Sequence, residues 1–116
     1  MAKLILSMDG QVLKEIPLSK ERITIGRKAH NDVQIDNLAV SGEHAVIVSV
    51  MDDAFLEDLG STNGTFLRRS RVRTEVALDD GDEIKVGTVV LTIRLWASDK
   101  APHTKRIRKR NKGPGS

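Results

Sequence analysis

The segment Gly60-Ser61-Thr62-Asn63-Gly64-Thr65 connects two apolar runs, Ala54-Phe55-Leu56 before it and Phe66-Leu67 after it. Its two glycines permit backbone angles that are closed to other residues. Between the glycines, hydroxyl and amide side chains can turn the backbone and still present hydrogen-bond donors outward. We therefore predict a hairpin-like connection between two strands, with a tip that carries donors and no carboxylate.

The chain before residue 96 consists of short apolar runs separated by Gly, Asn and Asp turns, without sustained helical periodicity. The run at 45–50 is rich in β-branched residues and nearly continuous in its apolarity, which indicates a central strand. Asp9-Gly10 predicts a two-residue hairpin turn. The sequence predicts an all-β sandwich with strands at 3–8, 11–16, 22–25, 33–35, 45–50, 54–58, 66–67 (interrupted at 68–71), 83–86 and 88–95.

Length and composition indicate one ordinary domain, since the chain has 116 residues and 39% of them are hydrophobic. Its apolar runs are far shorter than the ~20 residues of a membrane-spanning helix. The sequence has no cysteine, which excludes disulfides and is consistent with a reducing compartment. We expect a soluble, cytoplasmic protein.

The net charge of +3 is unevenly distributed. Residues 1–98 contain 12 Lys and Arg against 15 Asp and Glu, whereas residues 99–116 contain seven against one. We therefore divide the chain into a domain at 1–96 and a basic tail at 97–116 that is expected to be disordered. The last four residues resemble a cloning remnant. The tail lacks aromatic residues, so nucleic-acid or anionic-surface binding through it would be sequence-blind, and it is an alternative function.

Three motifs occur in order between the expected strands: Gly26-Arg27, Ser41-x-x-His44 and Leu59-Gly60-Ser61-Thr62-Asn63-Gly64-Thr65. Together they resemble the forkhead-associated (FHA) domain over roughly residues 3 to 95. The resemblance implies a β-sandwich of about eleven strands with recognition loops at one end. It also implies a non-catalytic module that binds phosphothreonine peptides in protein-kinase signalling, with no cofactor.

A phosphorylated side chain carries about −1.5 to −2 charges and three acceptor oxygens, so its site needs a cation and several donors. Arg27 can supply a planar guanidinium that suits phosphate. Ser41 can supply a hydroxyl and its own N–H, Gly42 can supply an N–H, and Thr62 can supply a second hydroxyl. The resemblance implies that Arg27, Ser41 and Thr62 contact the phosphate and that Asn63 holds the main chain of the peptide.

Structural interpretations remain open for each of these residues. Arg27 can form a surface ion pair with Asp32 or Asp36 instead of binding a ligand. The hydroxyls of Ser41 and Thr62 can cap turns, and Asn63 can occupy a turn position whether or not it binds a peptide.

Four further residues are assigned to the scaffold. His44 lies close to Ser41 in sequence, but no third orienting group for a catalytic triad is evident. The resemblance instead has His44 pinning neighbouring loops by hydrogen bonds. The glycines that we assign to backbone geometry are Gly26, Gly60 and Gly64. His30 and His103 have no companions that suggest a metal site.

The sequence departs from the family pattern at two places. Gly42 stands where the family usually has a long polar residue, so Lys28 is a candidate substitute. This glycine keeps open an alternative, an interaction scaffold without phosphate dependence. Arg68-Arg69 stands where the family often has Asn-Gly. These arginines are candidate accessory residues that would favour acidic residues beside the phosphothreonine, or they are a solvated turn.

The tail contains Thr104-Lys105-Arg106-Ile107, and the resemblance implies that an aliphatic residue three positions after a phosphothreonine is often preferred. Phosphorylated Thr104 is therefore a candidate self-ligand. A basic tail in which Thr104 has no special role explains the same residues.

Overall fold

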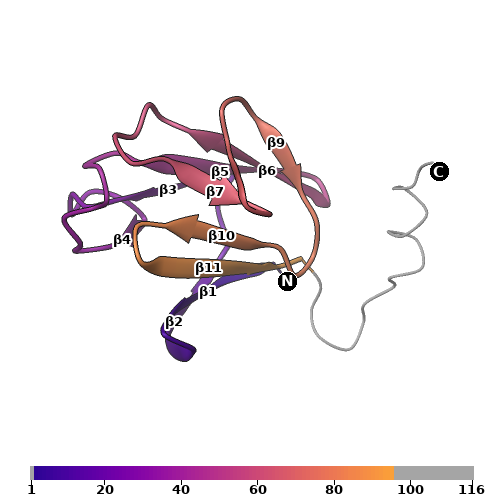
Figure 1. The fold of residues 1–116 in the computed structure, drawn as a ribbon. Helices are drawn as coiled ribbons and strands as arrows, with labels where there is room; N and C mark the ends of the chain where they lie inside the picture. The colour runs from indigo at the N-terminus through magenta and orange to yellow at the C-terminus, as the bar shows by residue number, and fades with distance from the viewer. Residues whose placement is uncertain (1, 96–116) are drawn as a thin grey trace.

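The computed structural model describes residues 2–95 of the chain. Eleven strands in this range form two sheets that face each other (Figure 1). The expectations for residues 97–116, including the basic tail and Thr104, lie outside the described residues and stay predictions. No helix within 2–95 has the length and apolarity needed to cross a membrane.

The first sheet has six strands in the order β2-β1-β11-β10-β7-β8. The second sheet has five strands in the order β4-β3-β5-β6-β9. The bounds in chain order are β1 Lys3–Met8, β2 Gln11–Pro17, β3 Arg22–Gly26, β4 Val33–Gln34, β5 Ala45–Val50, β6 Asp53–Asp58, β7 Thr65–Leu67, β8 Ser70–Arg71, β9 Val76–Leu78, β10 Glu83–Val86 and β11 Val89–Arg94.

These strands confirm the all-β prediction, because no helix forms within the described range. The β-branched run at 45–50 is β5, the middle strand of the five-stranded sheet. Asp9 and Gly10 have φ angles of 55° and 80°. Both positive angles suit a tight hairpin turn, and this turn joins the paired strands β1 and β2.

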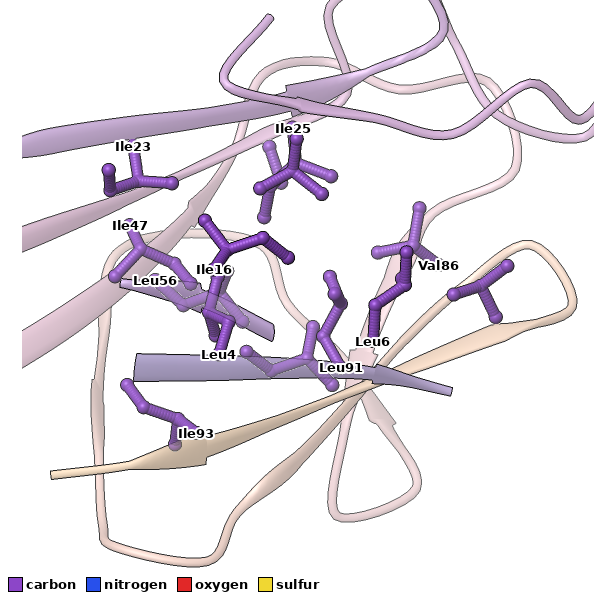
Figure 2. Packing of buried hydrophobic residues seen from close by; sticks show 14 of the residues in the cluster. Leu4, Leu6, Ile16, Ile23, Ile25, Ile47, Leu56, Val86, Leu91 and Ile93 are labelled. Carbon is purple, nitrogen blue, oxygen red and sulfur yellow. The ribbon is translucent and has the colours of Figure 1, made fainter. Parts of the chain in front are cut away.

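The hydrophobic core lies between the two sheets. Along β3 and β11, alternate residues such as Ile23, Ile25, Leu91 and Ile93 are buried, because successive side chains of a strand point to opposite faces. Figure 2 shows these side chains meeting from both sheets. The core fixes the sheets against each other and so holds the loops at their ends.

The prediction of a hairpin-like connection at 60–65 is wrong. β6, which precedes this segment, pairs with β5 and β9, whereas β7 pairs with β10 and β8 in the other sheet. The segment therefore crosses from one sheet to the other. The hairpin lies instead after β7, where Arg68-Arg69 forms a two-residue turn and Ser70–Arg71 continues as β8.

Candidate functional site

Three loops meet around Ser41, where hydrogen bonds join them. One follows β3, one precedes β5 and one follows β6. The amide of Arg27 donates to the carbonyl of Ser41 at 2.9 Å. The amide of Thr62 donates to the Ser41 hydroxyl oxygen at 3.0 Å. These bonds bring together Arg27, Ser41 and Thr62, which are separated in sequence.

The guanidinium of Arg27 is held by the same group of loops. Its Nε atom donates to the carbonyl oxygen of Val40 at 3.2 Å. The alternative ion pair of Arg27 with Asp32 or Asp36 does not form in the structure. Asp32 instead accepts hydrogen bonds from Lys20 and Thr24. The Lys20 ammonium and the Thr24 amide hold the pKa of Asp32 below its usual value.

His44 connects two of the loops through both ring nitrogens and is fully buried. The Ser41 amide donates to its Nδ1 at 3.0 Å. Because Nδ1 accepts, the hydrogen resides on Nε2, which lies 2.9 Å from the Gly64 carbonyl oxygen and donates to it. The Ser41 amide is therefore occupied, and the prediction that it would be offered to a ligand is wrong.

Asp58 organises the segment that carries Thr62. Its two carboxylate oxygens accept hydrogen bonds from the amides of Gly60 and Ser61 at 3.0 and 2.9 Å. They also accept from the hydroxyls of Ser61 and Thr65 at 2.6 and 2.7 Å. Burial raises the pKa of Asp58, but these four hydrogen bonds outweigh burial and hold the pKa below its usual value.

The loops after β3 and before β5 approach each other at Gly26. A Cβ atom at this position would lie 2.2 Å from the carbonyl oxygen of Gly42, so no side chain fits. Asn31 fixes this approach, since its amide nitrogen donates to the carbonyls of Gly42 at 2.7 Å and Lys28 at 2.9 Å. The side chain of Lys28 lies over Gly42, 3.0–3.3 Å from where a Cβ would stand.

The other glycines of the motif adopt backbone angles that favour glycine. Gly60 and Gly64 have φ angles of 80° and 92°, in the left-handed region. Asn63 is exposed, and its side-chain nitrogen donates to the Ala39 carbonyl at 3.0 Å. This bond ties the Thr62-bearing segment to the loop before β5.

Several donors at this junction have no hydrogen-bond partner among residues 2–95. They are the terminal amino groups of Arg27, the hydroxyl hydrogens of Ser41 and Thr62, the amide of Gly42 and the ammonium of Lys28. The neighbouring donors of Ser61, Gly64 and Thr65 are all used inside the fold. The junction thus presents unpaired donors and a cation on a scaffold fixed by internal bonds. Such a surface can bind an anion with several acceptor oxygens.

The structure places the two candidate accessory arginines outside the loop junction. Arg68 and Arg69 occupy the turn between β7 and β8, at the end of β7 that points away from Gly64. Arg68 forms ion pairs with Asp79 at 3.2 Å and Asp82 at 2.7 Å. No group of three or more His, Asp or Glu within 2–95 is arranged to hold a metal ion.

Comparison with known proteins identifies the family. The model of the FHA domain matches residues 23–87, a range that contains all three loops. The chain belongs to the FHA domain family. The sandwich and the loop junction described above are therefore an FHA fold and its loop end.

Two curated relatives are similar to this FHA domain in sequence. The transcriptional regulatory protein EmbR of Mycobacterium tuberculosis is 40% identical over 81 residues, which cover 70% of this chain and 21% of EmbR. The FHA domain-containing protein FhaB of the same organism is 33% identical over 79 residues, covering 68% of this chain and 51% of FhaB. The chain thus spans about a fifth and about half of these two relatives.

Solved structures agree with this assignment. EmbR of M. tuberculosis in complex with a low-affinity phosphopeptide superposes with a TM-score of 0.76 at 34% identity, covering 84% of this chain and 25% of EmbR. The FhaA FHA domain complexed with the intracellular domain of Rv3910 has a TM-score of 0.73 at 32% identity, covering 81% and 100% of the two chains. Both structures are complexes, with a phosphopeptide in the first and the intracellular domain of Rv3910 in the second.

Sequence reasoning missed two residues of this FHA domain's loops, Asp58 and Asn31. Asp58 precedes Gly60 and Ser61, and an Asp whose carboxylate accepts from amides two and three residues on is a recognisable turn signal. Asn31 gave no local signal, because its main partner, the Gly42 carbonyl, is brought near it only by folding.

Proposed function

We propose that this FHA domain is a binding module for phosphothreonine peptides. The observation that supports the proposal is the set of unpaired donors on Arg27, Ser41, Gly42 and Thr62, presented by loops that internal hydrogen bonds hold in place. A phosphate offers three acceptor oxygens and nearly two negative charges. The donors match its charge and its demand for several hydrogen bonds.

The geometry supports a separate role for each of these residues. Arg27 supplies the cation, since its Nε is fixed on Val40 and its terminal amino groups are left to donate to the phosphate. The Ser41 oxygen accepts from the Thr62 amide, so its hydroxyl hydrogen is left to donate to a phosphate oxygen. Thr62 donates through its hydroxyl. Asn63 holds the peptide main chain, positioned by its bond to Ala39.

Lys28 compensates for the missing side chain at Gly42 in this proposal. Its aliphatic chain packs over the Gly42 Cα, in the space that a longer residue at 42 would need. The ammonium group at its end is a second positive charge close to the phosphate. The Gly42 amide adds a backbone donor that does not depend on a side chain.

The partner is a protein phosphorylated on threonine, and the domain acts by binding without catalysing a reaction. Since protein kinases draw on ATP inside the cell, we propose that the module works on the cytoplasmic side. Binding of phosphorylated Thr104, in the chain's own tail, to the same site also stays a prediction.

Titration of matched peptides tests this function. Identical peptides carrying phosphothreonine, phosphoserine or unmodified threonine are titrated by calorimetry against wild type and Arg27→Ala. We expect a dissociation constant on the order of micromolar for the phosphothreonine peptide. Arg27→Ala should weaken it by about 1.5–3 kcal/mol, since a hydrogen-bonded charge is lost.

The matched control is Arg73→Ala, because Arg73 is exposed, outside the three loops, and carries the same charge. It should bind the phosphothreonine peptide as wild type does. Equal affinity for phosphorylated and unmodified peptides would contradict the proposal and support an interaction scaffold without phosphate dependence.

A further inference from the structure

The turn between β7 and β8 contains two arginines in a strained conformation. Arg68 and Arg69 have φ angles of 50° and 69°, and Leu67 pairs directly with Ser70. A two-residue hairpin turn with both φ angles positive strongly favours Asn-Gly, and other residues adopt such angles at an energetic cost. The sequence thus places long cationic side chains where short residues are preferred.

Internal contacts explain only one of these arginines. Arg68 forms ion pairs with Asp79 and Asp82, which lie between β9 and β10. Arg69 is exposed, and its side chain has neither a hydrogen bond nor an ion pair within residues 2–95. Backbone strain at a residue whose side chain forms no internal hydrogen bond or ion pair is a reason to look for a function of that side chain.

Arg69 lines a groove on the outer face of the six-stranded sheet. The groove has a volume of about 800 Å³ and extends from Asn63 and Gly64 to the Arg68-Arg69 turn. Volumes of roughly 300–1,000 Å³ are typical of ligand sites. Since Asn63 also belongs to the loop junction, the groove is continuous with the proposed phosphothreonine site.

Three residues on adjacent strands make the floor of this groove. Lys85 of β10 lies directly opposite Phe66 of β7 on one side and Val90 of β11 on the other. The three strands lie side by side in Figure 1. Phe66 and Val90 are half-buried and supply apolar surface, whereas Lys85 is exposed and has no ion-pair partner in the described range.

The charges of the groove favour an anion. Asp82 is engaged by Arg68 and by the Asp79 amide. The unpaired charges that line the groove are then Arg69 and Lys85, which are positive, and Glu83, which is negative. Glu83 lies on the same face of β10 as Lys85, two residues away, so it limits the positive potential without cancelling it.

We infer that this groove binds the segment of the partner that flanks the phosphothreonine, and that Arg69 and Lys85 select an anionic side chain on it. The inference rests on the function proposed above. An extended segment advances roughly 3.3 Å per residue, and β7 and its turn separate Gly64 from Arg69. The anionic residue is therefore placed about four to six residues from the phosphothreonine, with an apolar residue before it on Phe66 and Val90.

The anion can be a carboxylate or a second phosphate, because both accept hydrogen bonds from a guanidinium. The test compares a short phosphothreonine peptide with peptides lengthened by six residues, first on one side and then on the other. The lengthened peptides carry Glu, phosphoserine or Gln at the groove positions. Each is titrated against wild type, Arg69→Gly, Lys85→Gln and the charge-matched control Arg73→Ala.

Wild type should bind the Glu or phosphoserine peptide about three- to tenfold more tightly than the Gln peptide, the range expected for exposed charge pairs and charge-assisted hydrogen bonds. Arg69→Gly and Lys85→Gln should each remove most of this gain in affinity over the Gln peptide. Neither variant should change the affinity for the short peptide. Whichever of the Glu and phosphoserine peptides binds more tightly shows whether the groove prefers a carboxylate or a phosphate. Glu83→Gln should increase the gain.

Thermal unfolding separates this role from a structural one. Glycine adopts the positive φ of position 69 without strain, so Arg69→Gly should melt at the wild-type temperature or above it. Equal affinities for the Glu, phosphoserine and Gln peptides would overturn the inference, as would an equal loss of the gain in Arg73→Ala. If phosphorylation of threonine changes no affinity in any peptide, the proposed function fails as well. If the short phosphothreonine peptide binds with the expected affinity but the Glu and phosphoserine peptides bind no more tightly than the Gln peptide, only the inference about the groove fails.

Discussion

The Nε2 atom of His44 lies 2.9 Å from the carbonyl oxygen of Gly64, and the two residues belong to different loops. The other ring nitrogen of His44 is bound by the Ser41 amide. One buried imidazole therefore sets the position of the Ser41 hydroxyl relative to the segment that carries Thr62. The spacing of the proposed phosphate donors depends on a side chain that does not itself reach the surface.

Replacement of His44 by alanine should reduce both stability and binding. It leaves the Gly64 carbonyl and the Ser41 amide without partners and opens a cavity, so we expect a loss of about 2–4 kcal/mol in the free energy of unfolding. Denaturant unfolding and peptide titration of the same samples measure the two effects. His30→Ala is the stability control, since His30 is exposed and its ion pair with Glu43 at 3.2 Å is exposed as well. Lost binding at wild-type stability would show that His44 acts on the ligand directly.

Alanine at Gly26 and alanine at Gly42 should differ sharply. A Cβ at Gly26 would lie 2.2 Å from a backbone oxygen, which cannot move without separating two loops. We expect a loss of about 2 kcal/mol or more in the free energy of unfolding. The three atoms nearest to a Cβ at Gly42 all belong to the flexible side chain of Lys28, so Gly42→Ala should unfold within about 0.5 kcal/mol of wild type. Similar losses in both variants would contradict this account.

Acid should weaken the Thr62-bearing segment through Asp58. Its pKa is lower in the folded state than its usual value of 3.8, because its hydrogen bonds outweigh burial. The stabilisation is therefore complete above the unfolded pKa and is lost as the pH falls through the folded pKa. Asp58→Asn should be less stable than wild type at pH 7, and the difference should shrink below about pH 4. Thermal melts from pH 7 to pH 2 measure it; a constant difference would contradict the assignment.

Removal of the two hydroxyls should weaken phosphopeptide binding less than Arg27→Ala, because each variant removes a neutral donor. Thr62→Val keeps the amide that bonds Ser41 and should cost about 0.5–1.5 kcal/mol. Ser41→Ala also removes the acceptor of that amide, so it should cost more than Thr62→Val. Calorimetric titrations with one phosphothreonine peptide rank the three variants, and a Thr62→Val loss equal to that of Arg27→Ala would refute the neutral-donor role.

Lys28→Ala should weaken phosphopeptide binding modestly and make it less sensitive to salt. The ammonium acts through its charge near the phosphate, and such contacts are screened as ionic strength rises. Titrations at low and high salt measure the effect. Lys14→Ala removes a charge that is also exposed, on β2, and serves as the control. If both variants respond alike, Lys28 does not compensate for Gly42.

The strands were predictable from the sequence because their signals are local. Alternating burial along 22–26 and 89–94, the β-branched run at 45–50 and the Asp9-Gly10 turn are each determined within a few residues. The three loop motifs are also local, and their order along the chain was enough to suggest the family. The family match at residues 23–87 confirmed that suggestion.

Only the tertiary structure decided how these motifs meet. The segment at 60–65 has the composition of a hairpin turn. Composition alone does not decide whether the strands on either side of it, β6 and β7, pair with each other or with other strands. The core packing places β6 and β7 in different sheets, which makes the segment a crossover beside Ser41. Which donors remain free for a ligand likewise depended on pairings between distant residues, such as the Ser41 amide with His44 and Asn31 with Gly42. Local sequence cannot specify these pairings, because hydrogen-bond partners far apart in the chain are selected by the packing of the two sheets.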